Sequence, residues 1–117
     1  MAFDYGQYHK DMTLCLMDDI KETFIAKNAD YGSSFAKSVE KWGIIAAVVR
    51  MSDKWNRMEQ LITKDGECGV PAVPTESLED TLLDLATYAL MTAAALHANK
   101  EKRYMEMVVD PDGVERA

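Results

Sequence analysis

Apolar and polar positions alternate along the chain with the period of α-helices. Met12, Leu16, Ile20 and Phe24 recur every four positions, which is the spacing of one face of a helix. Polar residues occupy the opposite side of the same stretch. We therefore expect a first helix from about Tyr8 to Lys27.

A run of turn-forming residues follows this helix. Residues 28–34 read Asn-Ala-Asp-Tyr-Gly-Ser-Ser, in which Asn and Asp can bond their own backbone and Gly can take a positive φ. The helical period then resumes from Phe35 to Lys64, with Gly43 in its middle. Glycine in a helix interior costs about 1 kcal/mol relative to alanine. The pattern predicts that the first helix ends at residues 28–34 and that Gly43 separates a short helix from a long one.

The segment from Asp65 to Pro74 contains two glycines and two prolines, so no helix is expected to cross it. Thr75 or Ser77 is then placed to cap the next helix. Asp80 follows Ser77 by three positions, which resembles a capping box. The apolar period continues to Leu96, and we expect this last helix to fade around residues 100–104.

The beginning of the last helix carries an acidic face. On a helix advancing about 100° per residue, Glu76, Asp80 and Asp84 lie within an arc of roughly 80°. Carboxylates four positions apart repel each other, so the helix alone does not favour this arrangement. Leucines and alanines flank the acids on both sides. We therefore expect the acidic face to point into a bundle, towards cations.

The long helix before it carries a complementary stripe. Arg50, Asp53, Lys54 and Arg57 stand at positions i, i+3, i+4 and i+7, a spacing that places them on one face. If the two faces meet, they bring together three cations and four carboxylates, namely Arg50, Lys54, Arg57, Asp53, Glu76, Asp80 and Asp84.

Two interpretations of this cluster remain open. In the first it is a magnesium and phosphate site, because Mg²⁺ takes carboxylate oxygens, waters and substrate phosphates, while Arg and Lys neutralise the remaining phosphate charge. A spare carboxylate such as Asp53 or Asp80 then serves as the general base for hydrolysis of a phosphoanhydride. In the second the cluster is an interhelical salt-bridge network without chemistry.

Length, net charge and cysteine content indicate which binding partners and which cellular compartment to expect. The chain has 117 residues, which suits one domain, and its apolar helix surface leads us to expect an oligomer. A net charge of −7 disfavours binding of duplex nucleic acid. Cys15 and Cys68 have no metal-ligand spacing, and the N-terminal residues carry no apolar signal segment, so we expect a cytoplasmic protein with reduced thiols. The longest uninterrupted apolar run, residues 43–49, predicts no membrane role.

Three blocks of residues resemble a known family. They are Lys27-x-x-Asp30-Tyr31-Gly32, Arg50-x-x-Asp53-Lys54-x-x-Arg57 and Glu76-Ser77-x-x-Asp80-Thr81-Leu82-x-Asp84-Leu85-Ala86-x-Tyr88. In this order they resemble the nucleotide modification associated domain 1 family of phages and bacteria, which is related to the MazG-like all-α nucleoside triphosphate pyrophosphatases. The resemblance spans residues 12–96. The Arg50–Arg57 block stands where MazG-like enzymes have their first acidic motif, and the second motif is matched only by Glu76 and Asp80 or by Asp80 and Asp84.

The resemblance implies an antiparallel helical bundle, completed as a homodimer or homotetramer, with Mg²⁺ held by acidic residues. The implied metal ligands are Asp53, Glu76, Asp80 and Asp84, and the implied substrate-binding residues are Lys27, Asp30, Tyr31, Arg50, Lys54 and Arg57. Lys27 would contact phosphate, and Tyr31 or Trp55 would stack on a base. Without such a ligand, Trp55 is expected in the core.

These observations lead to three hypotheses. The first is a Mg²⁺-dependent pyrophosphohydrolase acting on an NTP or dNTP, in the host cytoplasm if a phage encodes it. The second is a non-catalytic protein that binds or sequesters a nucleotide. The third is a helical oligomeric interaction protein whose charges form only salt bridges. In each case residues 1–104 are expected to form one all-α domain and residues 105–117 a tail or small turn.

Overall fold

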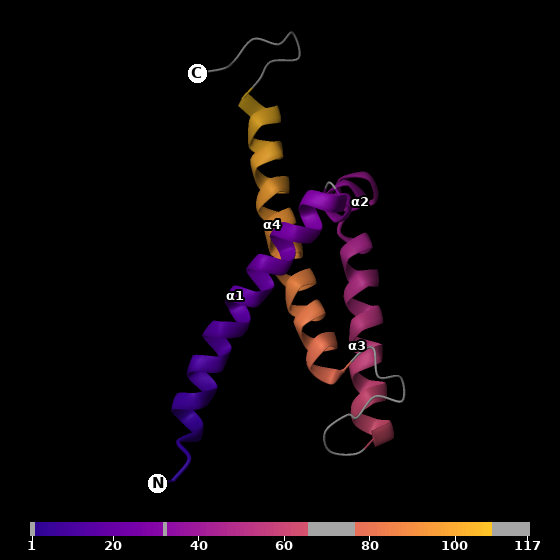
Figure 1. Ribbon diagram of the computed structural model, residues 1–117. Helices are drawn as coiled ribbons and strands as arrows, with labels where there is room; N and C mark the ends of the chain where they lie inside the picture. The colour runs from indigo at the N-terminus through magenta and orange to yellow at the C-terminus, as the bar shows by residue number, and fades with distance from the viewer. Residues whose placement is uncertain (1, 32, 66–76, 109–117) are drawn as a thin grey trace. The chain divides into compact units, whose positions relative to one another are not determined.

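The computed structural model describes residues 2–31, 33–65 and 77–108, and these residues form four helices (Figure 1). The helices are α1 (Tyr5–Tyr31), α2 (Ser34–Trp42), α3 (Ile45–Asp65) and α4 (Leu78–Val108). The described ranges contain no strand, which confirms the all-α prediction. The chain divides into two compact units, residues 1–34 and 35–117, and each is described by itself below. The predicted loop 65–74 lies almost entirely outside the described residues, as does most of the expected tail.

The first unit consists of α1, which is longer at both ends than expected. Asp4 caps it, since the carboxylate Oδ1 accepts a hydrogen bond of 3.1 Å from the backbone N–H of Gln7. The helix continues to Tyr31, so it ends within residues 28–34 as predicted, but four residues later than the expected Lys27. Asn and Asp are only mildly unfavourable in a helix, and no glycine or proline occurs between residues 7 and 31 to stop it. Ser33, which follows the helix, has a φ of 62°, in the left-handed region.

The side chains of α1 form no core within their own unit. Leu14, Met17 and Ile25 are each more than half exposed, and no described side chain of the helix is fully buried. Apolar residues lie around the whole helix, so they do not define one packing face. Helices in proteins are stabilised mostly by tertiary packing, and residues 1–34 by themselves supply α1 with little of it.

The second unit begins with α2, which ends where the sequence predicts. Gly43 has a φ of +85°, and its N–H donates a hydrogen bond of 2.7 Å to the carbonyl of Val39. This left-handed residue closes the helix and lets the chain turn into α3. The prediction that Gly43 separates a short helix from a long one is confirmed.

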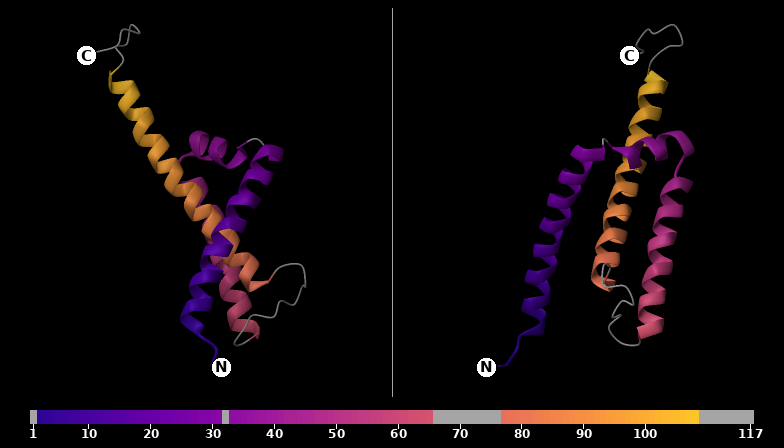
Figure 2. Two further views of the ribbon diagram at one scale, coloured as in Figure 1. Left: turned by 60° about the vertical axis from the view of Figure 1, so that its left-hand side comes forward. Right: turned by 45° about the vertical axis from the view of Figure 1, so that its right-hand side comes forward.

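Helices α3 and α4 lie side by side and run antiparallel, which can be seen in all three views of Figures 1 and 2. On α3, Ala47 and Leu61 are buried at positions 14 residues apart, which places them on one face. Lys54 stands midway between them and is half-buried. On α4, Thr81 is fully buried. A charged residue therefore occupies the middle of an otherwise apolar row of α3.

Helix α2 is attached to α4 through aromatic side chains. The rings of Phe35 and Tyr88 have their centroids 5.6 Å apart and are tilted by 43°. This is the separation at which aromatic pairs attract beyond their shared apolar area. Tyr88 thus packs within the second unit, and it also lines the hollow described below.

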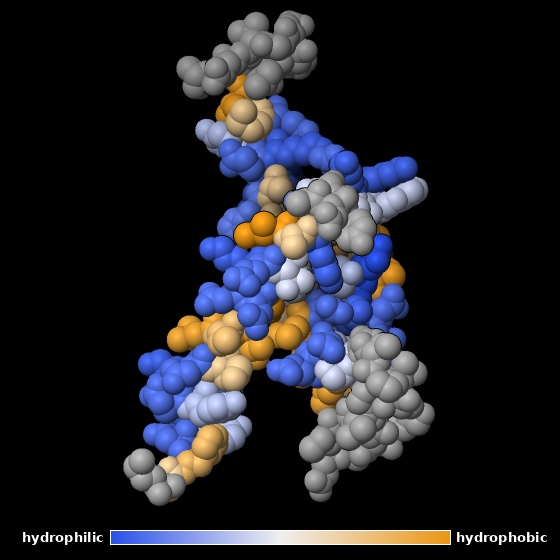
Figure 3. Space-filling view, viewed as in Figure 1, coloured by the Kyte–Doolittle hydropathy of each residue, from blue (hydrophilic) through white to orange (hydrophobic). Residues whose placement is uncertain are grey.

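Few apolar side chains are buried in the described ranges. Val39, Ala47 and Leu61 are the buried apolar residues there, while many large ones are open to solvent and form the orange patches in Figure 3. A patch-rich surface of this kind is typical of a chain that associates with another surface.

Helix α4 is the longest element and extends to Val108, beyond the expected fade at residues 100–104. No glycine or proline interrupts it. By length and composition alone it could cross a membrane, and 11% of its most apolar window is buried. This is a weak indication, because apolar helices of soluble proteins pass the same test. The expectation of no membrane role overlooked this segment, because it considered only uninterrupted apolar runs, and it stays a prediction.

Candidate functional site

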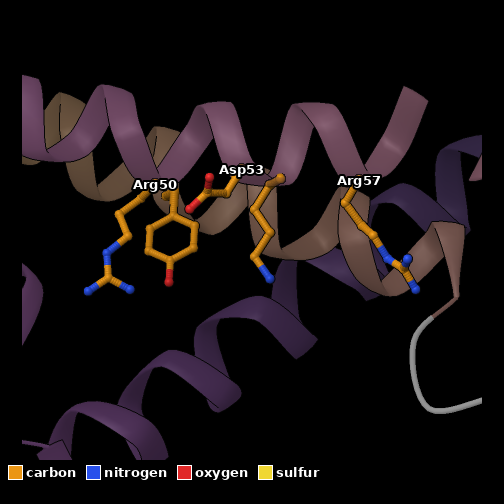
Figure 4. A pocket seen from close by; sticks show the side chains of 5 residues that line it. Arg50, Asp53 and Arg57 are labelled. Atoms are coloured by element: carbon orange, nitrogen blue, oxygen red, sulfur yellow. The ribbon is translucent and has the colours of Figure 1, made fainter. Parts of the chain in front are cut away.

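A hollow of about 310 Å³ opens beside α3 and α4. Its lining residues are Arg50, Asp53, Lys54, Arg57 and Tyr88. Figure 4 shows Arg50, Asp53 and Arg57 leaving α3 on the same side, with Asp53 between the two arginines along the helix. The stripe expected from the sequence therefore lines one continuous surface, and α4 adds the tyrosine.

Within the described residues, Lys54 and Asp84 form an ion pair between the two charged faces. The Nζ atom of Lys54 lies 3.0 Å from Oδ2 of Asp84, and the two side chains are 27% and 41% exposed. Both groups are thus partly removed from water, where their attraction is stronger than on an open surface. This contact fits the salt-bridge interpretation for Lys54 and Asp84, and it also holds the lysine at the edge of the hollow.

Asp80 has a local structural role at the start of α4. Its backbone N–H donates to the hydroxyl of Ser77 at 3.0 Å, and the N–H of Ser77 donates to Oδ2 of Asp80 at 3.2 Å. These reciprocal bonds form a capping box, in which two of the unpaired donors of the first turn are satisfied. The predicted cap at Ser77 is confirmed. Of the three acids expected on one helical face, Asp80 and Asp84 lie on α4, and Glu76 lies outside the described residues.

The acidic residues do not assemble into a multi-ligand metal centre among the described residues. No group of three or more His, Cys, Asp or Glu side chains there could hold a metal ion. Mg²⁺ needs only one or two protein carboxylates when phosphate and water supply the other ligands. Asp53 in the hollow and Asp84 beside Lys54 are oxygen donors of the right kind for such a partial set. The four-carboxylate site stays a prediction.

The first block of the resemblance lies in the other unit. Lys27 is exposed on α1, while Asp30 and Tyr31 occupy its last turn and not a loop as expected. The hollow is lined by residues of the second unit alone. The binding roles of Lys27, Asp30 and Tyr31 therefore stay predictions.

Two aromatic residues differ from expectation. Trp55 was expected in the core, but it is 51% exposed and its indole N–H donates to Oε1 of Glu59 at 2.7 Å. It does not line the hollow. Tyr88, which the sequence reasoning did not select, does line it. Its position one helical turn after Asp84 was the available signal, since residues four apart share a helix face.

Comparison with known proteins adds no family to this description. No family model, no curated protein and no solved structure matches the chain.

Proposed function

We propose that this protein binds the phosphate groups of a nucleoside triphosphate in the hollow beside α3 and α4. The observation that carries the proposal is the lining itself, in which three cationic side chains and one carboxylate surround about 310 Å³ next to a tyrosine. In a protein with a net charge of −7, three cations around one hollow form a local basic region that suits an anion.

The types of side chain fit a polyphosphate. Arg50 and Arg57 are seven positions apart on one face of α3, a separation of about 10 Å along the helix, so their guanidinium groups can meet different phosphates of one chain. Arginine presents paired N–H donors that match two phosphate oxygens, whereas Lys54 acts as a point charge. The ring and hydroxyl of Tyr88 supply a flat apolar surface and a hydrogen-bonding group beside these cations.

Hydrolysis of the bound nucleotide with Mg²⁺ is a second candidate function. It is favoured by Asp53, a carboxylate on the same wall as the cations, where a purely anion-binding surface has no need of one. Bound Mg²⁺ would lower the pKa of a water molecule and neutralise phosphate charge. Asp53 would supply an oxygen ligand or accept a proton from that water, and Arg50 and Arg57 would orient the phosphates. Release of pyrophosphate is the reaction that the resemblance favours.

Isothermal titration with ATP, GTP and the corresponding dNTPs, each with Mg²⁺ and with EDTA, tests the binding. We expect Arg50→Ala and Arg57→Ala each to weaken binding by about tenfold or more, since charge-assisted bonds contribute roughly 1.5–3 kcal/mol. Lys37→Ala is the matched control, because it removes one exposed cation of α2 that does not line the hollow. Failure of every nucleotide to bind at millimolar concentration contradicts the proposal and favours the interpretation of the charges as structural.

Pyrophosphate release separates the two functions. Turnover that requires Mg²⁺ and is lost in Asp53→Asn, with nucleotide binding in EDTA retained, supports the hydrolase. Tight binding without turnover at any Mg²⁺ concentration supports a protein that binds or sequesters the nucleotide.

A further inference from the structure

A second surface of the protein lies on α4, away from the candidate site. Seven residues follow each other at alternating spacings of three and four positions, which is the spacing of a helix–helix seam. They are Glu79, Leu82, Ala86, Ala89, Ala93, Leu96 and Lys100. We call this row the α4 seam. It is centred roughly 100° around the helix from Thr81, which is buried, and from Thr92, whose hydroxyl contacts Met51 of α3.

The α4 seam and its neighbours are apolar and open to solvent. Leu82, Leu90 and Leu96 are 43%, 62% and 50% exposed. The only formally charged side chain from Thr81 to Ala98 is Asp84, and it forms the ion pair with Lys54 of α3. Over about five helical turns, the face of α4 that points away from α3 therefore carries no formally charged side chain. Surface helices of soluble proteins carry charges on the face that meets water, so this face is built for contact with another apolar surface.

The order of residues along the α4 seam is symmetric about its middle. Leu82 and Leu96 are each seven positions from Ala89, and the positions between them are alanines. Glu79 and Lys100 stand ten and eleven positions from Ala89, with opposite charges. Two copies packed antiparallel would therefore place leucine against leucine, alanine against alanine and Glu79 of each copy near Lys100 of the other. The small central side chains allow the two helices to approach closely.

The surface around Lys100 agrees with this arrangement. A hollow of about 600 Å³ is lined by Ile44 of the α2–α3 junction and by residues of the last turns of α4, including Leu96, Lys100, Lys102 and Arg103. In an antiparallel pair the first turn of the other α4, which carries Glu79 and Asp80, arrives at this end of the α4 seam. The lining also contains Glu106 and still has an excess of positive charge, and Glu79 of the other copy meets Lys100 there. Opposite charges across an interface fix its register and direction.

We propose that the α4 seam is the contact surface of a two-fold symmetric dimer, in which α4 packs antiparallel against α4 of a second copy. Such an isologous interface uses the same patch on both subunits, as the symmetry of the α4 seam requires. The inference rests on α4 and does not depend on nucleotide binding in the hollow beside α3.

A lipid bilayer is a less suitable partner for the same surface. Helix α3 packs along α4 at the level of Asp84 and carries Arg50, Asp53, Lys54 and Arg57. A bilayer that enclosed the apolar part of α4 would place these charges at the depth of the hydrocarbon, which costs several kcal/mol. A second copy covers the apolar surface and leaves α3 in water.

Sedimentation velocity on the full chain provides the first test. Ala89→Glu places two like charges near the two-fold axis, and we expect it to halve the sedimenting mass at micromolar concentration. Ala98→Glu is the matched control, since it adds the same charge to an exposed alanine of α4 outside the α4 seam and is expected to leave the mass unchanged. Far-UV circular dichroism confirms that both variants remain helical.

Cysteine cross-linking tests the direction of packing in a Cys15→Ser, Cys68→Ser background. We expect Ala89→Cys to form a disulfide with itself, and a mixture of Leu82→Cys and Leu96→Cys chains to form mixed disulfides. In an antiparallel dimer neither Leu82→Cys nor Leu96→Cys cross-links alone. Self-cross-linking of both would show a parallel arrangement and overturn the proposal. A monomeric wild-type chain, or one that partitions into neutral phosphatidylcholine vesicles, would overturn it as well.

Charge reversal tests the ends of the α4 seam. Glu79→Lys and Lys100→Glu should each weaken dimerisation several-fold, because each variant brings like charges together at two symmetric places. The double variant Glu79→Lys/Lys100→Glu should recover the wild-type dimerisation constant. Equal dimerisation by all three variants contradicts the assigned register.

Discussion

The Nζ atom of Lys54 lies 3.0 Å from Oδ2 of Asp84. This ion pair joins α3 to α4 among the apolar residues where the two helices pack together. Lys54 stands seven residues from each of the buried side chains Ala47 and Leu61, so its methylene groups lie in an apolar row while its ammonium group reaches Asp84. The same lysine lines the candidate site. Packing and charge at the site are therefore coupled through one side chain.

Removal of Asp84 should destabilise the chain. We expect Asp84→Ala to lower the free energy of unfolding by about 1–2 kcal/mol, because the half-buried ammonium group of Lys54 loses its ion pair with this carboxylate. Lys54→Met in the same background should recover much of this loss, since it replaces the cation by an apolar side chain of similar length. Urea unfolding of the single and double variants at one protein concentration measures the coupling, and additive effects would show that the pair contributes nothing.

Asp84→Asn should change nucleotide binding in opposite directions with and without Mg²⁺. In EDTA we expect affinity to rise a few-fold, because a negative charge near the phosphates is lost. With Mg²⁺ affinity should fall if Asp84 helps to hold the metal. Titration under both conditions separates these effects, and a fall in EDTA would contradict the assignment of phosphates to this hollow.

The capping box can be tested apart from any chemistry. Ser77→Ala should cost about 1 kcal/mol of stability, because the N–H of Asp80 loses its acceptor. Asp80→Glu should be nearly neutral, since glutamate is the usual partner in this motif. Thermal unfolding gives both values. If Asp80 also binds metal, Asp80→Glu will lower turnover with no loss of stability.

Gly43→Ala should destabilise the junction of α2 and α3. A β-carbon there meets no atom within 4 Å, so the whole effect comes from the φ of +85°, which alanine adopts at a cost of about 1 kcal/mol. Gly43→Asn should cost less, because asparagine tolerates the left-handed region. Equal losses in the two variants, measured by chemical unfolding, would point to a different cause.

Tyr88→Phe and Tyr88→Ala should separate packing from binding. The phenylalanine variant retains the ring that meets Phe35, so its stability should be unchanged, while the loss of the hydroxyl should weaken nucleotide binding. The alanine variant should lose about 1–3 kcal/mol of stability as well, because Tyr88 is only partly buried. Circular dichroism and titration on the same samples give the two readouts.

Much of the second unit follows from short-range rules in the sequence. The spacing of apolar residues predicts α3 and α4, Gly43 predicts the break before α3, and Ser77 with Asp80 predicts the start of α4. These features depend on residues within one or two turns of each other. The end of α1 does not, because Asn28 and Asp30 are compatible with both a helix and a turn and only the surrounding chain decides between them.

The candidate site was predictable in part for the same reason. The spacing of Arg50, Asp53, Lys54 and Arg57 is enough to place them on one surface of α3. Which acid meets which cation depends on how α3 and α4 slide past each other, and no local pattern fixes that. Asp84 meets Lys54, whereas Asp80 turns back to Ser77. Tyr88 was overlooked because its role depends on both Phe35 and the hollow.

The small core of the described residues, together with the proposed dimer, predicts a stability that depends on protein concentration as well as on the sequence. Val39, Ala47 and Leu61 alone bury too little apolar surface to offset the entropy of ordering four helices. In the proposed dimer, contacts between copies add to the folding free energy, and mass action makes that contribution depend on protein concentration. Dilution should act as a denaturant, with a melting temperature that rises as the concentration of the protein is raised.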